Sequence, residues 1–185
     1  MKPLIKKLTE TFSPSGYENA IREVIKEEIK DLADEIRVDA LGNLIARKGS
    51  GGKKVMLAAH MDEIGLIVNH VDENGFVRFT PIGGVFPHTL VGSRVEFLNG
   101  VSGIISARFL VRPVKLISSA KMYIDVGATS PKDCPVQVGD VATFTRPYLE
   151  MGNRLVAKSM DDRIGVAVLI ETMRKLKSSP NEIYF

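Results

Sequence analysis

The feature of this sequence that most restricts its fold is a change of hydrophobic pattern along the chain. Before about residue 69, apolar residues recur at helical spacing or stand in one dense run, and helical spacing returns after about residue 155. In between, short apolar runs alternate with glycine-containing turns, and almost no helical period is left. This order predicts an α/β domain that is interrupted by an inserted all-β domain.

The predicted domain boundaries follow from the same pattern. We expect residues 1–68 to form the first part of the α/β domain, 69–155 a small β-barrel or sandwich, and 156–185 the continuation of the α/β domain. Two consecutive domains are the alternative. It is less favoured, because one helix and one short strand cannot enclose a hydrophobic core of their own.

The first segment predicts two helices and three strands. Helical spacing covers residues 4–12 and, after the "SPSG" break, a second helix whose inward side chains are Ile21, Val24, Ile25, Ile29 and Leu32. Ser15 and Glu18 have the spacing of a capping box at the start of that second helix. Residues 35–49 predict two strands joined by a turn, and "KVMLAAH" (54–60) predicts a strand that is buried on both faces.

The later segments predict a hairpin, further short strands and one long helix. The hairpin loop contains Asn74-Gly75. Residues 161–177 predict a helix, and "EIYF" (182–185) predicts a new strand. The expected buried face of that helix carries Ile164, Val168, Leu169, Met173 and Leu176. The stretch 106–121 has basic residues without an acid, and we interpret it as a solvated loop and strand edge. Its charged residues are Arg108, Arg112, Lys115 and Lys121.

The composition excludes several classes of function. With 185 residues, 44% of them apolar and 25% charged, the chain resembles an ordinary globular protein. Its net charge of +3 is too small to indicate a nucleic-acid or membrane partner, and no apolar run approaches the roughly 20 residues of a membrane span. A single cysteine, Cys134, excludes an intrachain disulfide, and the N-terminus lacks the apolar region of a signal peptide. We therefore expect a cytoplasmic protein.

The predicted strand 54–60 ends in side chains that can bind a metal. His60 and Asp62 stand at its carboxyl end, where open α/β sheets place their functional sites. Two residues apart in an extended chain, they point to the same side, so a neutral His60 can bind a metal through one ring nitrogen while Asp62 accepts a hydrogen bond from the other. A helix-capping aspartate beside a structural histidine is the alternative, and the local pattern favours neither.

The second candidate is the pair Asp161 and Asp162 at the start of the predicted helix. Free N–H groups and the helix dipole stabilise a carboxylate there, so the local pattern favours simple capping for one aspartate. The other is harder to explain, because adjacent carboxylates repel unless a cation or Arg163 compensates. A carboxylate that bridges two metal ions would account for it.

Several stretches together resemble one known family, the tetrahedral (TET-type) cytosolic metallo-aminopeptidases, which include glutamyl and deblocking aminopeptidases. The similar stretches cover most of the chain in the same order: "TFSPSGYE", "VDALGNLIA", "VMLAAHMDEIGLIV", "NGFVRFTPIGGV", "IDVGATS", "VGDVATF" and "DDRIGVAVL". The resemblance implies a three-layer α/β/α aminopeptidase domain, incomplete here, that is interrupted by a PDZ-like β domain. In the family that β domain makes dimers, and six dimers build a hollow dodecamer.

The resemblance also implies a peptide substrate and two divalent metal ions, zinc or cobalt. Carried over by motif position, His60 binds one metal, Asp161 bridges both, and Asp62 orients His60. Asp162 and Arg163 belong to the motif without an assigned role. The family's general-base glutamate and its later metal ligands would follow the last residue of this sequence. We therefore expect an N-terminal part with little peptidase activity of its own.

Two alternatives belong to other classes of function. The first is a non-catalytic assembly module that self-associates through the inserted β domain. The second, and least favoured, is a glycoside hydrolase of the endoglucanase type. Glycosidases need a pair of carboxylates flanking the scissile bond, and the sequence singles out no such pair over the metal interpretation.

Overall fold

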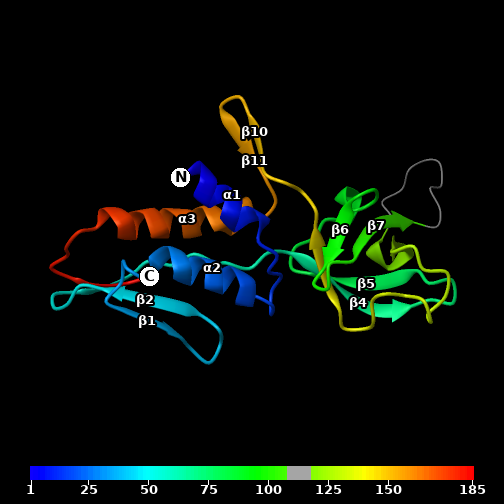
Figure 1. Ribbon diagram of the computed structural model, residues 1–185, viewed down its shortest axis with the longest axis horizontal. Helices are drawn as coiled ribbons and strands as arrows, with labels where there is room; N and C mark the ends of the chain where they lie inside the picture. Colours follow the sequence, from blue (N-terminus) through cyan, green and yellow to red (C-terminus); the bar gives the residue numbers. More distant parts are fainter. Residues whose placement is uncertain (108–117) are drawn as a thin grey trace. The chain divides into compact units, whose positions relative to one another are not determined.

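The chain forms two compact units in a computed structural model that describes residues 1–107 and 118–185. The α/β unit comprises Met1–Asp62 and Tyr148–Phe185, and the barrel unit comprises Glu63–Pro147 (Figure 1). The chain thus combines a mixed α/β unit with an all-β unit inserted into it. The positions Arg108, Arg112 and Lys115 of the basic stretch lie outside the described residues.

The boundaries of the barrel unit lie a few residues before those expected from the sequence. Strand β4 (Gly65–Val71) belongs to the barrel over its whole length, so residues 65–68 do not continue the α/β domain. At the other end, the hairpin of β10 (Leu149–Met151) and β11 (Arg154–Val156) belongs to the α/β unit. A long-range hydrogen bond connects the residue before this hairpin to α1: the Tyr148 N–H donates to Glu10 at 3.0 Å. Strand periodicity alone does not reveal which core a strand joins.

Three α-helices and a four-stranded sheet make up most of the α/β unit. The helices are α1 (Lys2–Glu10), α2 (Asn19–Ile29) and α3 (Met160–Lys175). The sheet has the order β1-β2-β12-β3, with β1 (Glu35–Val38), β2 (Leu44–Lys48), β12 (Glu182–Tyr184) and β3 (Lys54–Met56). Strand β12 pairs antiparallel with β2 and parallel with β3. Figure 1 shows α2 and α3 running beside each other above β1 and β2.

The core of the α/β unit lies between these helices and the sheet. The predicted inward residues Ile21, Ile25 and Ile29 of α2 are all buried. They form one cluster with residues of α1, β2 and α3: Leu4, Ile5, Leu8, Ala46, Val166, Ala167, Ile170 and Met173. Side chains from four separate elements therefore stabilise this unit together, which no single helix could do.

Three local predictions for this unit are wrong. The expected buried strand 54–60 is only three residues long, and its outermost position in the sheet leaves Met56 78% exposed. The predicted capping box does not form, because the Ser13 hydroxyl, not that of Ser15, accepts the N–H of Ile21 at 3.1 Å. On α3, Val168 is 51% exposed. This helix is apolar on most of its circumference, so its periodicity fits more than one face.

The barrel unit is a closed six-stranded barrel with the order β4-β5-β8-β7-β6-β9. Because the barrel is closed, it has no unpaired edge strand. Apolar side chains such as Val77, Phe97 and Ile124 form its core. Besides β4, its elements are β5 (Val77–Ile82), η1 (Pro87–Thr89), β6 (Arg94–Phe97), β7 (Ser102–Ala107), η2 (Ser119–Lys121), β8 (Met122–Asp125) and β9 (Val141–Phe144).

The hairpin predicted around Asn74-Gly75 joins β4 to β5. Gly75 has a positive φ of 80°, and a Cβ there would lie 2.7 Å from the backbone of Ala128. Asp72 closes the loop by accepting the N–H groups of Asn74 and Phe76. The turn residues therefore fix this loop locally, as the sequence indicates.

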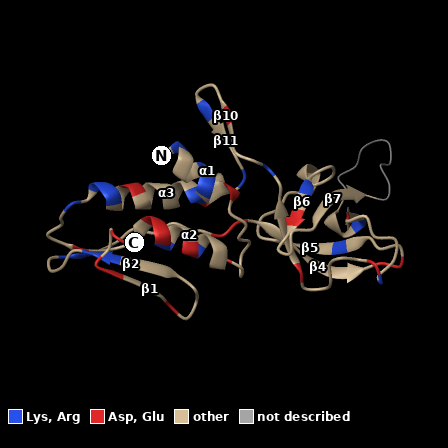
Figure 2. Cartoon of the chain, in the orientation of Figure 1, with Lys and Arg blue, Asp and Glu red and all other residues tan. Residues whose placement is uncertain are grey.

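Basic and acidic residues occur side by side on the elements of both units (Figure 2). This distribution agrees with the small net charge of +3. Within the described ranges, no helix has the length and apolar character needed to cross a membrane.

Candidate active site

The chain leaves the sheet of the α/β unit just before His60. The Leu57 N–H still donates to the carbonyl of Tyr184 at 2.8 Å, which extends the β12–β3 ladder by one residue. Residues 58–62 then run without regular structure from the carboxyl end of this parallel pair. His60 and Asp62 therefore stand where the sequence predicts them, at the carboxyl end of a strand.

His60 contacts two carboxylates at once, one through each ring nitrogen. Its Nδ1 lies 2.9 Å from Oδ1 of Asp62, and its Nε2 lies 3.0 Å from Oδ1 of Asp161, which is 101 residues further along the chain. The side chains are 54%, 34% and 96% exposed for His60, Asp62 and Asp161. The fold thus brings the two candidate segments together on one accessible edge of the α/β unit.

The two neighbouring aspartates have different structural roles. Regular helical dihedral angles begin only after Asp162, and the peptide bond between the two aspartates is cis. The Oδ1 of Asp162 accepts the N–H of Gly165 at 3.0 Å, which is the contact of an N-cap residue. Asp162 therefore caps α3, and the carboxylate of Asp161 is left to face His60.

Arg163 is a buried structural residue and does not belong to the exposed cluster of His60, Asp62 and Asp161. Its side chain is fully buried, and its Nη1 donates to the carbonyl of Leu8 and, at 3.2 Å, to that of Thr11. The start of α3 is thereby tied to the last turn of α1 and the residue that follows it. Through these hydrogen bonds Arg163 helps to fix the backbone of the segment that carries Asp161.

Ser15 is the residue of this network that the sequence analysis missed. Its hydroxyl donates to Oδ2 of Asp62, the oxygen that does not face His60. The sequence predicts that Ser15 forms a capping box with Glu18, and it shows nothing of a partner 47 positions away. Only the "SPSG" segment marks the region, and its glycine and proline indicate a turn and not a contact.

The electrostatics of the cluster agree with the contacts. Burial alone would lower the pKa of His60, but the hydrogen bonds to Asp161 and Asp62 outweigh it and the pKa is raised. Burial likewise acts to raise the pKa of Asp62, and the hydrogen bonds from Ser15 and His60 overcome it, so that this pKa is lowered. Asp62 is therefore held as a carboxylate at neutral pH.

The arrangement places Nε2 of His60 and Oδ1 of Asp161 close enough to share a proton or a metal ion. When a neutral His60 donates its Nδ1 proton to Asp62, its Nε2 is an acceptor, and at 3.0 Å it faces a second acceptor. Two acceptors stay at this distance when a proton or a metal ion lies between them. An imidazole nitrogen and a carboxylate oxygen are both ordinary ligands of zinc.

The other two histidines belong to the barrel unit. His70 lies in β4, and the ring of His88 in η1 stacks on Phe86 with centroids 5.7 Å apart. Over the part of the chain that the structure describes, no group of three or more His, Cys, Asp or Glu side chains is arranged to hold a metal ion. The described residues by themselves therefore do not form a complete metal site.

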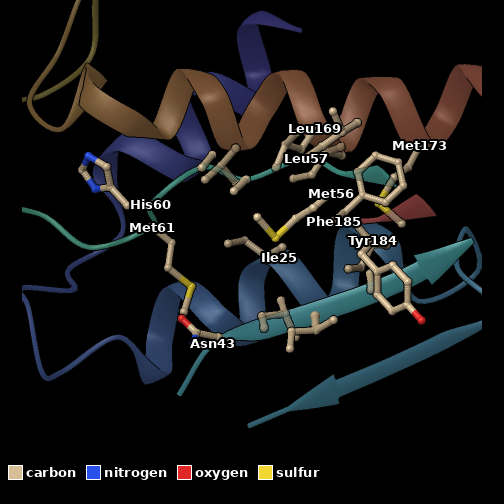
Figure 3. Close-up of a pocket in the computed structure, with 18 of the residues that line it drawn as sticks. Ile25, Asn43, Met56, Leu57, His60, Met61, Leu169, Met173, Tyr184 and Phe185 are labelled. Carbon is tan, nitrogen blue, oxygen red and sulfur yellow. The ribbon is translucent and has the colours of Figure 1, made fainter. Parts of the chain in front are cut away.

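A cavity of about 690 Å³ lies beside the cluster in the α/β unit. It is lined mainly by apolar residues of α2, α3 and the strands around β3, and His60 and Asp62 contribute to its wall. Figure 3 shows His60 at one end of this cavity, with Met173, Tyr184 and Phe185 grouped at the other.

Comparison with known proteins decides the family. The model of the M42 glutamyl aminopeptidase family matches residues 42–185. The chain belongs to the M42 glutamyl aminopeptidase family. A putative aminopeptidase of Acetivibrio thermocellus is 46% identical over 187 residues, which cover all of this chain and 57% of that relative. This M42 chain therefore spans little more than half the length of that relative.

Two solved structures of aminopeptidases share the fold. An aminopeptidase from the archaeon Desulfurococcus kamchatkensis superposes with a TM-score of 0.93 at 36% identity, over 98% of this chain and 54% of that one. A TET peptidase of Pyrococcus horikoshii, described as assembling into a tetrahedron or a large octahedral shell, gives 0.91 at 34% identity, over 100% and 59%. The chain therefore shares the fold of a little more than half of each of these two proteins.

Proposed function

We propose that this chain supplies part of the metal centre of an aminopeptidase that removes N-terminal residues from peptides. In this proposal His60 and Asp161 are metal ligands, Asp161 is the one that bridges two divalent ions, zinc or cobalt, and Asp62 orients His60. The observation that carries the proposal is the 3.0 Å approach of His60 Nε2 to Asp161 Oδ1. Membership of the M42 family supports the class of reaction.

The donor set fits a metal as one part of a site. A nitrogen and an oxygen ligand converge, and the Asp62 carboxylate on the far ring nitrogen selects the tautomer whose Nε2 is free to bind. Zinc in catalytic sites takes about three protein ligands and a water. Two ligands are therefore too few, and the remainder would come from the portion of the relatives that this chain does not span.

Each described residue has a definite task in such a reaction. When His60 is neutral, Asp62 accepts its Nδ1 proton, which leaves Nε2 as the acceptor and fixes the plane of the ring. Asp161 projects from the start of α3 into solvent, 96% exposed, where a peptide terminus can reach it. Bound divalent ions would lower the pKa of a coordinated water to about 7 and polarise the scissile carbonyl. We place the proton acceptor for that water, like the further ligands, in the portion of the relatives that this chain does not span.

The peptidase proposal is tested by the release of amino acids from short unblocked peptides. We expect the 185-residue chain with added zinc or cobalt to show no chelator-sensitive turnover. We expect turnover once the chain is extended by the C-terminal portion of the Acetivibrio thermocellus relative. The variant Asp161→Asn should abolish activity of the extended protein, and the control Asp125→Asn, on β8 in the barrel unit, should not. Full activity of Asp161→Asn would contradict the proposal.

A second candidate function, assembly through the barrel unit, is favoured by the closure of that unit. The barrel is closed and has its own core, so it can act independently of an incomplete metal site. We propose that it corresponds to the PDZ-like insertion of the family and that it makes contacts between copies of the chain. Leu98 and Val138 are each 62% exposed on it.

Light scattering at micromolar concentration tests the assembly function. We expect a dimer or a larger species for the unmodified chain, and a smaller mass when Leu98 and Val138 are both changed to Asp. Leu41 in the α/β unit is 90% exposed, and Leu41→Asp serves as the matched control. A chain that is monomeric throughout would count against assembly.

A further inference from the structure

The linker between α1 and α2 contacts both arms of the candidate metal site. One arm is the segment His60–Asp62, and the other is the start of α3 with Asp161. Ser15 in the linker donates to Asp62. The carbonyls of Thr11, the first residue of the linker, and of Leu8, in the last turn of α1, accept from Arg163. The His60–Asp62 segment and the start of α3, about 100 residues apart in the sequence, thereby both form hydrogen bonds with the same short stretch of chain.

The linker itself is held in place by contacts that do not involve the site. The Ser13 hydroxyl accepts the N–H of Ile21 at 3.1 Å and so ties the linker to α2. The carbonyl of Pro14 accepts the N–H of Tyr17 at 2.8 Å and closes the turn that carries Ser15. Ser13 and Pro14 are both buried. Ser15 therefore presents its hydroxyl from a fixed frame and not from a free loop.

The contact from Ser15 decides how Asp62 can rotate. A carboxylate that is about one third exposed and holds one partner turns readily about its side-chain torsions. With Ser15 on Oδ2 and His60 on Oδ1, both oxygens are engaged and the plane of the carboxylate is set. That plane in turn sets the plane of the imidazole, and with it the direction in which Nε2 points toward Asp161.

We propose that Ser15 is a positioning residue of the metal centre: it holds Asp62 so that Asp62 holds the His60 ring in line with Asp161. This inference rests on the proposed function, because its purpose is to preorganise a ligand. It assigns Ser15 no contact with metal or substrate. Ser15 acts through two successive hydrogen bonds.

The first test observes the metal-free chain and needs no activity. Nitrogen-15 NMR of the His60 ring reports which nitrogen carries the proton, and a hydrogen-bonded Nδ1 proton exchanges slowly with water. We expect one tautomer with a protected Nδ1 proton in the unmodified chain. Ser15→Ala should give mixed tautomers and lose the protection, and Ser15→Thr, which keeps a hydroxyl, should restore both.

The matched control is Thr11→Ala in the same linker. The Thr11 hydroxyl donates to the carbonyl of Lys7 at 2.7 Å, so this variant loses one linker hydroxyl without touching Asp62. We expect it to leave the His60 spectrum unchanged. If Ser15→Ala and Thr11→Ala give the same His60 spectrum as the unmodified chain, the positioning role is refuted.

The second test measures by calorimetry the zinc affinity of the same variants, made in the chain extended by the C-terminal portion of the Acetivibrio thermocellus relative. Loss of a residue that hydrogen-bonds to a metal ligand weakens metal binding about 10- to 100-fold. Ser15 hydrogen-bonds to Asp62 and not to a ligand itself, so we expect Ser15→Ala to weaken zinc binding about 3- to 10-fold. Thr11→Ala should bind zinc like the extended protein without substitutions. If the extended protein without substitutions binds no zinc while the His60 spectra behave as expected, the proposed function fails and the positioning by Ser15 stands.

Discussion

Replacing Gly165 by Ala tests the assignment of Asp162 as the helix cap. A Cβ at position 165 would lie 2.4 Å from Oδ2 and 2.5 Å from Oδ1 of Asp162, closer than any real contact. Asp162 must then give up the hydrogen bond that it accepts from the N–H of residue 165. The lost cap costs about 1 kcal/mol. Alanine in place of glycine in a helix gains about 1 kcal/mol. The two effects oppose each other, so Gly165→Ala alone should leave the free energy of unfolding nearly unchanged.

A double-mutant cycle separates these two effects. In a chain that already carries Asp162→Ala there is no carboxylate to displace, so Gly165→Ala should stabilise the protein by about 1 kcal/mol. The predicted coupling of about 1 kcal/mol exceeds the roughly 0.3–0.5 kcal/mol within which independent sites add. Urea unfolding followed by circular dichroism measures all four chains. Equal effects of Gly165→Ala in both backgrounds would refute the reasoning.

Two further predictions concern stability and association. The pKa of Asp72 is lowered, because hydrogen bonds from Arg78 and the backbone outweigh its burial. The stabilisation of the folded state by ionised Asp72 is therefore complete above the pKa of about 4 that Asp has in the unfolded chain. It is lost as the pH falls through the lower pKa of Asp72 in the folded chain. Asp72→Asn should cost up to about 1 kcal/mol at pH 7 and less at pH 2.5, and an equal cost at both pH values in urea unfolding would contradict this. Strand β3 exposes Met56 at the edge of the sheet, so Met56→Lys should reduce self-association measured by light scattering more than Met151→Lys on β10. Equal effects of the two substitutions would speak against an edge that drives association.

Much of the fold could be predicted because local pattern and tertiary structure agree. The helical spacing of residues 4–12 and 161–177, and the hairpins of β1–β2 and β4–β5, are set by side-chain period and turn residues. Burial was harder to predict. The apolar run around Met56 shows that the strand can be buried, but it cannot show that β3 is the outermost strand of the described sheet.

The site could be predicted in part for the same reason. His60 and Asp62 lie close in sequence at a strand end, so their alignment follows from strand geometry. The sequence could not decide which of Asp161 and Asp162 caps the helix, because either carboxylate suits a helix start. The contact between Ser15 and Asp62 depends on how the linker folds back, and no local period encodes it.

The central claim is that His60 and Asp161 hold one metal ion together, and zinc titration calorimetry of the extended protein tests it most directly. The account predicts that His60→Ala and Asp161→Ala each weaken zinc binding about tenfold or more, and that the double variant binds no better than either. His88→Ala in the barrel unit should leave the affinity unchanged. Undiminished zinc binding by either His60→Ala or Asp161→Ala would contradict the claim.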